Sequence, residues 1–304
     1  MNKKWKFILS LISCIISIGV MYIFDLKKWS LGCGVVGAFL GNCFTETTDR
    51  FKDITDNTNW KTSQRRLERG GFINKNTRVR VSFSYLFRIR VQNKYFLVKN
   101  ARGTGKYQPV GGVYKYENVE GKYLRQVFYA EDDNKIPSDE SSKNDYRLNF
   151  ENQYLRKFMK RFDQTYGREN LCNLSREFKE ELIDTDLLDI KDFGTISYTY
   201  FGRHITNLEF DNYFQCFEIL LADIVELNLT EIQEQKFLEL LNKENDQYIF
   251  ATMDDIKSLG VKAGSDELKA YIADHSTKIL VGNNELFLPE GKQYKEAEYT
   301  CAVK

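Results

Sequence analysis

Residues 175–184, SREFKEELID, carry the pattern on which the interpretation of this chain depends. In and before this stretch, apolar residues recur at intervals of three and four positions, at Leu171, Leu174, Phe178 and Leu182. This spacing predicts a helix over 171–182 with one apolar stripe. Three acids then lie one turn apart on a neighbouring face, namely Glu177, Glu180 and Glu181. Carboxylates this close repel one another unless a cation lies among them, so we expect a divalent ion such as Mg²⁺ there.

Arg176 stands directly before the three acids and is placed to orient one of them while the others bind the metal. The metal would hold a pyrophosphate and act as a Lewis acid or as the source of a bound hydroxide. If the chain is a hydrolase, the candidate catalytic residues are therefore Arg176, Glu177, Glu180 and Glu181. The alternative is a solvated acidic face, and the three acids alone would favour it.

A second motif lies upstream of this helix. The stretch RVRVSFSYLFRIRV (78–91) alternates apolar and polar residues, which predicts a long strand with one buried face. A turn at 92–94 and the apolar run 95–98 complete a hairpin. The sequence PVGG (109–112) follows, and its glycine pair indicates a sharp bend or a close approach of another group to the backbone.

Together the two motifs resemble the Nudix family. The stretch 176–181, REFKEE, matches the Arg-Glu-x-x-Glu-Glu core of the Nudix box, and 109–112 resembles the loop that precedes it. The resemblance covers about 77–288 and implies an α+β chain with an α/β/α sandwich around a mixed sheet. It also implies that the three glutamates bind divalent metal and help to cleave nucleoside diphosphate derivatives.

Several positions depart from the family pattern. The long segment 113–175 separates the glycine loop from the Arg-Glu core, which the family keeps close together. Arg168 stands where an upstream glutamate is expected, with Glu169 beside it. Ile183 replaces a glycine and Asp184 an aliphatic residue. A site that keeps three acids and loses its outer positions favours nucleotide binding over turnover.

The N-terminal segment has a different character. Residues 7–24, FILSLISCIISIGVMYIF, carry no charge and nearly match a hydrocarbon core of about 30 Å. A second uncharged run at 29–45 follows a short turn, so we expect a two-span transmembrane hairpin over 1–45. A cleaved signal peptide is the alternative, but no small-residue cleavage site follows the first run.

Basic residues set the expected orientation of this hairpin. They precede the first run and follow the second, at Lys3, Lys4, Lys6, Arg50, Lys52, Lys61, Arg65 and Arg66. We therefore expect a two-pass membrane protein with both termini in the cytoplasm. Gly37 and Gly41 form a Gly-x-x-x-Gly pair that favours close helix packing and self-association, although glycine is also common in membrane helices.

The remaining chain is predicted to begin with a polar connector at 46–76. A Nudix-like domain follows at 77–290, with an insertion at about 117–168, and a loose tail at 291–304 ends the chain. Further strands are expected at 194–201, 213–221 and 248–250, and further helices at 155–162, 230–241, 252–259 and 265–274. The net charge of +1 gives no electrostatic reason to bind a DNA or RNA duplex. The six cysteines show no Cys-x-x-Cys spacing, so we expect them to be reduced.

A two-span hairpin followed by a Nudix-like domain with an insertion is similar to the SMODS-associated Nudix family. Its members are CD-NTase-associated membrane effectors of bacterial CBASS antiphage systems. The resemblance implies that the soluble domain senses a cyclic nucleotide second messenger. The membrane part would then oligomerise and disrupt the inner membrane lipid, either by pore formation or by general disruption of the bilayer, which causes abortive infection.

The candidate ligand contacts lie in and after the loop at 100–106. Arg102 and Lys106 are expected to bind phosphates and Tyr107 to stack on a base, with Gly111 and Gly112 close to the nucleotide. Two alternatives to the effector stay open. One is a membrane-tethered, Mg²⁺-dependent Nudix hydrolase, and the other is a membrane scaffold whose soluble domain binds protein.

Overall fold

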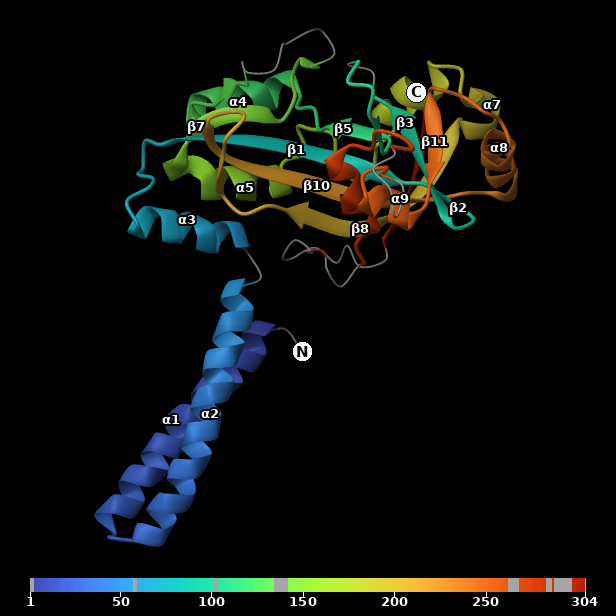
Figure 1. Cartoon of the computed structure of the whole chain (residues 1–304). Coiled ribbons are helices and arrows are strands. Elements are labelled where there is room, and N and C mark those ends of the chain that lie inside the picture. The colour runs from blue at the N-terminus through green and yellow to red at the C-terminus, as the bar shows by residue number, and fades with distance from the viewer. Residues whose placement is uncertain are drawn as a thin grey trace. The chain divides into compact units, whose positions relative to one another are not determined.

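The chain divides into two compact units, Met1–Gly70 and Gly71–Lys304, and each is considered by itself. Figure 1 shows the elements of both. The structure is a computed structural model, and it describes residues 3–56, 59–100, 103–133, 142–261, 268–282, 286 and 297–303.

The first unit is helical. Its elements are α1 (Lys3–Leu26), α2 (Ser30–Asp56) and α3 (Asn59–Arg69). A tight turn joins α1 to α2, and the amide of Trp29 donates to the carbonyl of Phe24 at 3.0 Å. The two helices then run antiparallel, because Cys33 approaches the carbonyl of Met21 at 3.9 Å near the turn, while Ser13 contacts Cys43 at 3.4 Å farther from it.

One helix in the described part of the chain is long and apolar enough to cross a membrane, over Phe7–Leu26 in α1. The second predicted span, 29–45, does not meet that standard. Its helix does not stop at Thr45 but continues to Asp56 through residues that are mostly polar or charged. Among the described residues the two helices thus form a hairpin in which only α1 has membrane-spanning length and hydropathy, and this measure does not support a second span.

The second unit is built on a sheet of eight described strands, and this sheet is mixed, as the resemblance to the Nudix family implied. The strands are β1 (Arg78–Arg88), β5 (Gly111–Val113), β6 (Glu131–Asp132), β7 (Arg147–Glu151), β8 (Thr195–Ile205), β9 (Glu209–Asp211), β10 (Cys216–Asn228) and β12 (Glu298–Ala302). The main order is β12-β8-β10-β1-β7-β6, with β5 beside β1 and β9 beside β10. The β1–β10 pair is parallel and the other pairs are antiparallel.

A smaller antiparallel sheet adjoins it. Its strands are β2 (Arg90–Val91), β3 (Lys94–Lys99), β4 (Tyr107–Gln108) and β11 (Tyr248–Ala251). Strand β3 pairs on one side with β11 and on the other with β2 and β4. The hairpin predicted at 78–98 is confirmed, although a break at Ile89 carries its strands into two different sheets.

Helices pack on both faces of the large sheet and against the smaller sheet. They are α4 (Asn118–Phe128), η2 (Asn152–Tyr154), α5 (Leu155–Gln164), α6 (Arg176–Phe178), η3 (Lys179–Ile183), α7 (Ile190–Phe193), α8 (Glu231–Leu241), α9 (Met253–Lys257) and η4 (Asp274–Leu280). Phe83 of β1 packs edge-on against Phe162 of α5 at 4.7 Å. On the opposite face, Leu86 packs in a core cluster with Ile279 of η4.

Strand β1 differs from the sequence prediction of one polar face. Arg80 and Arg88 are only 3% and 6% exposed. The reason is position, since β1 has a neighbouring strand on each side and helical segments over both faces. Arg80 is compensated by Asp133 at 2.8 Å and Glu218 at 2.7 Å, so its charge is buried as part of a network.

The insertion predicted at about 117–168 folds onto the domain. It contributes α4, β6, β7 and α5, and β7 pairs antiparallel with β1, with Val79 opposite Phe150. The predicted helix at 155–162 is confirmed, and its apolar stripe is buried. The inserted segment therefore extends the large sheet at its β7–β6 side (Figure 1).

The C-terminal elements are partly as predicted. The helix at 230–241 is confirmed, and Thr230 and Gln233 form its capping box. The helix predicted at 265–274 is wrong where it is described, because residues 268–273 are not helical and a 3₁₀ helix follows over Asp274–Leu280; residues 262–267 lie outside the described part. Residues 298–302, expected in a loose tail over 291–304, instead form β12 and pair with β8.

Candidate functional site

The carboxylate helix begins at Arg176, later than the predicted 171, and ends at Ile183. The hydroxyl of Tyr198 explains the late start. It donates to the carbonyl of Leu171 and accepts from the amide of Leu174, both at 3.0 Å, so these backbone groups are held by a tertiary contact. The last turn is a π-helix, a form that often occurs at functional sites.

Arg176 lies at the centre of the acids. Its Nε is 2.6 Å from Glu169, its Nη1 is 2.6 Å from Glu177 and 3.3 Å from Glu180, and its Nη2 donates to the carbonyl of Val113 at 2.9 Å. One guanidinium thus compensates three carboxylates, and it ties the carboxylate helix to the end of β5. Arg176 therefore contacts two of the three predicted metal-binding acids, and its role in orienting them stays a prediction.

The departure at Arg168 is compensated by the next residue. Glu169 contacts Arg176, with its Oε1 2.6 Å from the Nε of the guanidinium. Arg168 itself is buried, with its guanidinium 3.7 Å from the ring centre of Phe162, and it donates to the carbonyl of that residue. Glu169 was visible in the sequence, but its role needed the loop conformation.

The glycine loop lies directly against the acids. The amide of Gly111 donates to Glu181 at 2.9 Å, and Gly111 has a φ of +146°. A Cβ on Gly112 would lie 1.8 Å from Glu177 Oε1. The close approach that the glycine pair indicated is therefore an approach of the loop to Glu177 and Glu181.

Burial raises the pKa of two of the three acids, Glu177 and Glu181. Burial, followed by the charge of Glu177, raises the pKa of Glu181 to about 8. Burial also raises the pKa of Glu177, although the neighbouring Arg176 opposes this. Glu180 is different, because its side chain is 49% exposed. Two buried carboxyls that repel each other are stabilised by either a proton or a cation.

The donor set fits a divalent cation, because hard ions take carboxylate oxygens. Mg²⁺ would be held by Glu177, Glu180 and Glu181, and it would supply a Lewis acid there. As they stand, the described side chains do not converge into a group of three or more metal-binding residues. Arg176 lies among the same carboxylates and already compensates part of their charge.

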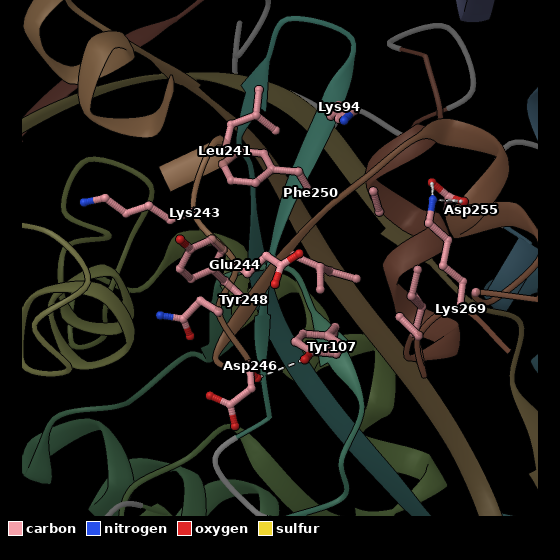
Figure 2. A pocket seen from close by; sticks show the side chains of 16 residues that line it. Lys94, Tyr107, Leu241, Lys243, Glu244, Asp246, Tyr248, Phe250, Asp255 and Lys269 are labelled. Atoms are coloured by element: carbon pink, nitrogen blue, oxygen red, sulfur yellow. Dashed lines mark hydrogen bonds and ion pairs between the residues drawn. The ribbon is translucent and has the colours of Figure 1, made fainter. Parts of the chain in front are cut away.

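A cavity of about 840 Å³ lies beside the edge strand β11 (Figure 2). Its volume is within the range of small-molecule sites. Aromatic walls come from Tyr107, Tyr248 and Phe250. The Tyr107 hydroxyl donates to the carbonyl of Asp246 at 2.9 Å. The charged lining residues are Lys94, Lys243, Lys269, Glu244, Asp246 and Asp255.

Strand β4 separates this cavity from the carboxylate helix. Tyr107 lines the cavity, while the side chain of the next residue, Gln108, is hydrogen bonded to Glu181. Successive residues of a strand point to opposite faces, which accounts for the two directions. Asn100 also donates to Gln108 at 2.6 Å. The two-residue strand β4 thus lies between the cavity and Glu181, the acid whose pKa burial raises to about 8.

The predicted ligand residues do not form one group. Tyr107 lines the cavity, whereas Gly111 and Gly112 lie at the carboxylate helix. Lys106 is not among the cavity residues, and its ammonium is 4.0 Å from Asp274 in a half-exposed pair. Arg102 lies outside the described residues.

The sequence did not predict a buried polar network on the face of the large sheet that α5 covers. Asp223 of β10 is fully buried and contacts Arg203 through two hydrogen bonds of 2.8 and 3.0 Å. The hydroxyls of Tyr114 and Tyr200 also donate to it, at 2.8 and 3.0 Å. The available signal was a lone acid inside the apolar run ILLADIV at 219–225.

In the first unit, Gly37 and Gly41 lie on a side of α2 that α1 does not cover. A Cβ at either position would meet no atom within 4 Å. Gly32 contrasts with them, because a Cβ there would lie 2.6 Å from the Trp29 ring. The predicted association pair is therefore outside the contact between α1 and α2.

Comparison with known proteins identifies the second unit. The sequence profile of the SMODS-associated NUDIX domain matches residues 78–280, and no curated protein matches the chain significantly. Among solved structures, the crystal structure of a UDP-X diphosphatase aligns over 92% of this chain and 94% of its own, with 9% identity and a TM-score of 0.22, too low to relate the folds. The profile match covers the carboxylate helix, the glycine loop and every described strand except β12, so the chain belongs to the SMODS-associated NUDIX domain family.

Proposed function

We propose that the chain is a ligand-gated membrane effector of a CBASS antiphage system. Its Nudix domain binds a cyclic nucleotide second messenger, and its N-terminal helices then oligomerise and disrupt the cell inner membrane. The observation that carries this proposal is the combination of a SMODS-associated Nudix domain with an apolar helix of 20 residues, Phe7–Leu26, in one chain. Many hairpins gathered by ligand-bound domains would associate through multivalency.

In this proposal the helical hairpin enters the bilayer with both ends on the cytoplasmic side. The antiparallel contact of α1 and α2 supports a return of the chain to the side of entry. The part of α2 beyond Thr45 is charged and would leave the lipid. Lysine and arginine flanking both ends agree with this orientation.

Binding without turnover is supported by the charge balance of the carboxylate helix. Arg176 is already within hydrogen-bond distance of Glu169, Glu177 and Glu180. The chain thus supplies a cation of its own among these acids. The ligand is proposed to occupy the cavity beside β11, where the ring of Tyr107 offers a stacking surface.

A second candidate function is a membrane-tethered, Mg²⁺-dependent Nudix hydrolase. The specific observation in its favour is the pair of buried acids, Glu177 and Glu181, that lies against the glycine loop. Their raised pKa values mean that a bound cation would relieve their repulsion. In that case Gly111 and Gly112 would allow a diphosphate to approach the acids closely.

The two functions separate in one experiment on the full chain in detergent. The protein is incubated with cyclic and linear nucleotides, each with Mg²⁺ and with a chelator, and both thermal stability and nucleotide cleavage are measured. Stabilisation by a cyclic nucleotide without cleavage supports the effector. Mg²⁺-dependent cleavage supports the hydrolase. If neither stabilisation nor cleavage is observed, the result supports a scaffold that binds protein.

The membrane step has its own test. The full chain in liposomes, with a stabilising nucleotide, is expected to release a trapped dye. A chain that lacks residues 1–45 should bind the same nucleotide and release nothing. Equal release by the two chains would contradict the role assigned to the N-terminal helices.

A further inference from the structure

Three basic side chains lie on the face of the large sheet that is opposite the carboxylate helix, and burial followed by the charge of Lys278 lowers the pKa of both histidines among them. His204 lies on β8 opposite Ala222 of β10, and Ala222 shares a core cluster with Ile279 of η4. His275 and Lys278 lie on η4 itself, which packs against β1 and β10. A 3₁₀ helix has three residues per turn, so His275 and Lys278 lie one above the other.

The surrounding acids are engaged elsewhere. Glu218 accepts from Arg80 at 2.7 Å, and Asp274 lies 4.0 Å from Lys106. Within the described ranges, no carboxylate comes within ion-pair distance of Lys278. The cluster therefore contains more cationic than anionic groups, and Lys106 adds a further cation at its edge.

The cluster is half-buried, which makes the excess of positive charge costly. Burial lowers the pKa of Lys278, with Glu218 acting in the opposite direction. Burial and the ammonium of Lys278 lower the pKa of His275 to about 4, with a further contribution from Lys106 and an opposing one from Asp274. The Nδ1 atom of His204 is buried and has no hydrogen-bond partner among the described residues. Among the described residues these groups have no anionic partner, and they are only partly buried, so they remain accessible to one.

We propose that His204, His275 and Lys278 form an oxyanion site that binds a phosphate group, either free or on a phosphorylated ligand. A tetrahedral phosphate accepts hydrogen bonds from several donors at once, and charge-assisted bonds of this kind are the strong ones. The bound anion would make each imidazole easier to protonate, and Lys278 would keep its proton. The site does not depend on turnover at Glu177 or Glu181, because it lies on the other face of the sheet.

The composition of the chain gives this proposal a direct readout. The sequence contains two histidines, and both are in the cluster. The full chain, labelled with ¹⁵N-histidine in detergent, is titrated by NMR in inorganic phosphate and in chloride of equal ionic strength. Phosphate should raise the apparent pKa of both imidazoles, by about one unit at saturation, because an opposite charge has entered within contact distance.

Lys278→Met is the decisive variant, and Lys257→Met, an exposed lysine at the end of α9, is its matched control. The phosphate-dependent shift should vanish in Lys278→Met and persist in Lys257→Met. If Lys278→Met does not fold, His204→Gln serves instead, with His275 as the reporter and a weakened shift expected.

Two results would overturn the site. One is an absence of any phosphate effect on the histidines of the wild-type chain, and the other is an equal effect with and without Lys278. The source of the anion is decided by repeating the titration with a nucleoside monophosphate. Saturation at a lower concentration than inorganic phosphate identifies a phosphorylated ligand, whereas saturation at the same concentration identifies free phosphate.

Discussion

Glu169 holds the guanidinium of Arg176 through two hydrogen bonds, of 2.6 Å from Nε and 3.2 Å from Nη2. The same carboxylate accepts from the amide of Lys115 at 2.9 Å. It therefore connects the carboxylate helix with the segment after the glycine loop. Because Arg176 in turn contacts Glu177, the position of Glu177 depends on a residue outside the helix.

Replacement of Glu169 by alanine should destabilise the domain by about 1–3 kcal/mol, since it leaves a partly buried guanidinium and a backbone amide without their acceptor. The measurement is urea unfolding at pH 7. Glu180→Ala is the matched control, because Glu180 is half-exposed and its 3.3 Å contact with Arg176 should contribute less than about 1 kcal/mol. Equal losses in the two variants would contradict the connecting role of Glu169.

Gly112→Ala should displace Glu177, because the new Cβ would lie 1.8 Å from its Oε1. We expect weaker binding of Mn²⁺, used as a probe for a divalent cation at the acids, with a loss of about tenfold or more in affinity if an acid ligand is moved. Isothermal titration calorimetry measures this. Gly282→Ala, where a Cβ meets no atom within 4 Å, is the control and should bind as the wild type does.

The pattern of the sequence predicted much of this site, because local spacing determines which residues share a helix face. Glu177, Glu180 and the glycine pair could all be identified in this way, and the family assignment is confirmed by the profile match. Glu169, the partner of Arg176, could not be identified from the pattern, because it lies one residue after the position at which the family has a glutamate. Only the loop held by Tyr198 brings Glu169 into place.

The errors in the fold have a common physical cause. The alternation of β1 suggested one polar face, yet Arg80 is buried because partners distant in sequence, Asp133 and Glu218, neutralise it. The segment 298–302 has a polar composition typical of a tail, but its backbone completes the edge of β8. Both outcomes depend on contacts between remote segments, which spacing along one chain does not encode.

The pH dependence of stability provides a test at His275. Its pKa falls from about 6.5 in the unfolded chain to about 4 in the folded one, through burial and the charges of Lys278 and Lys106, with Asp274 opposing. Between these values the unfolded chain binds more protons, so the contribution of His275 is present above about pH 6.5 and is lost as the pH falls toward 4. Urea unfolding at pH 4.5 and 7 should show a smaller acid loss in His275→Gln than in the wild type. An unchanged loss would rule out the titration of His275 as its source.

Asp223→Asn should be among the most destabilising single substitutions in the domain. The carboxylate is fully buried and compensates Arg203, so its neutralisation leaves a buried cation with one remaining acid, Asp163 at 2.6 Å. We expect a loss of about 3–5 kcal/mol, typical of breaking a buried pair. Urea unfolding measures it, with Asp246→Asn as an exposed control that should change stability by less than about 1 kcal/mol.

The proposed oligomerisation of the hairpin depends on the uncovered side of α2. Leucine at Gly37 or Gly41 adds bulk where a Cβ meets no atom within 4 Å, so the contact between α1 and α2 should survive. If these glycines mediate close approach between hairpins, either substitution should reduce crosslinked oligomers of the full chain in liposomes with the activating nucleotide. Gly19→Leu on α1 is the matched control, since a Cβ there also meets open space, and it should crosslink as the wild type does. Equal crosslinking by all three variants would show that the hairpins associate through another surface, and an equal loss in all three would show that added bulk anywhere on the hairpin is sufficient.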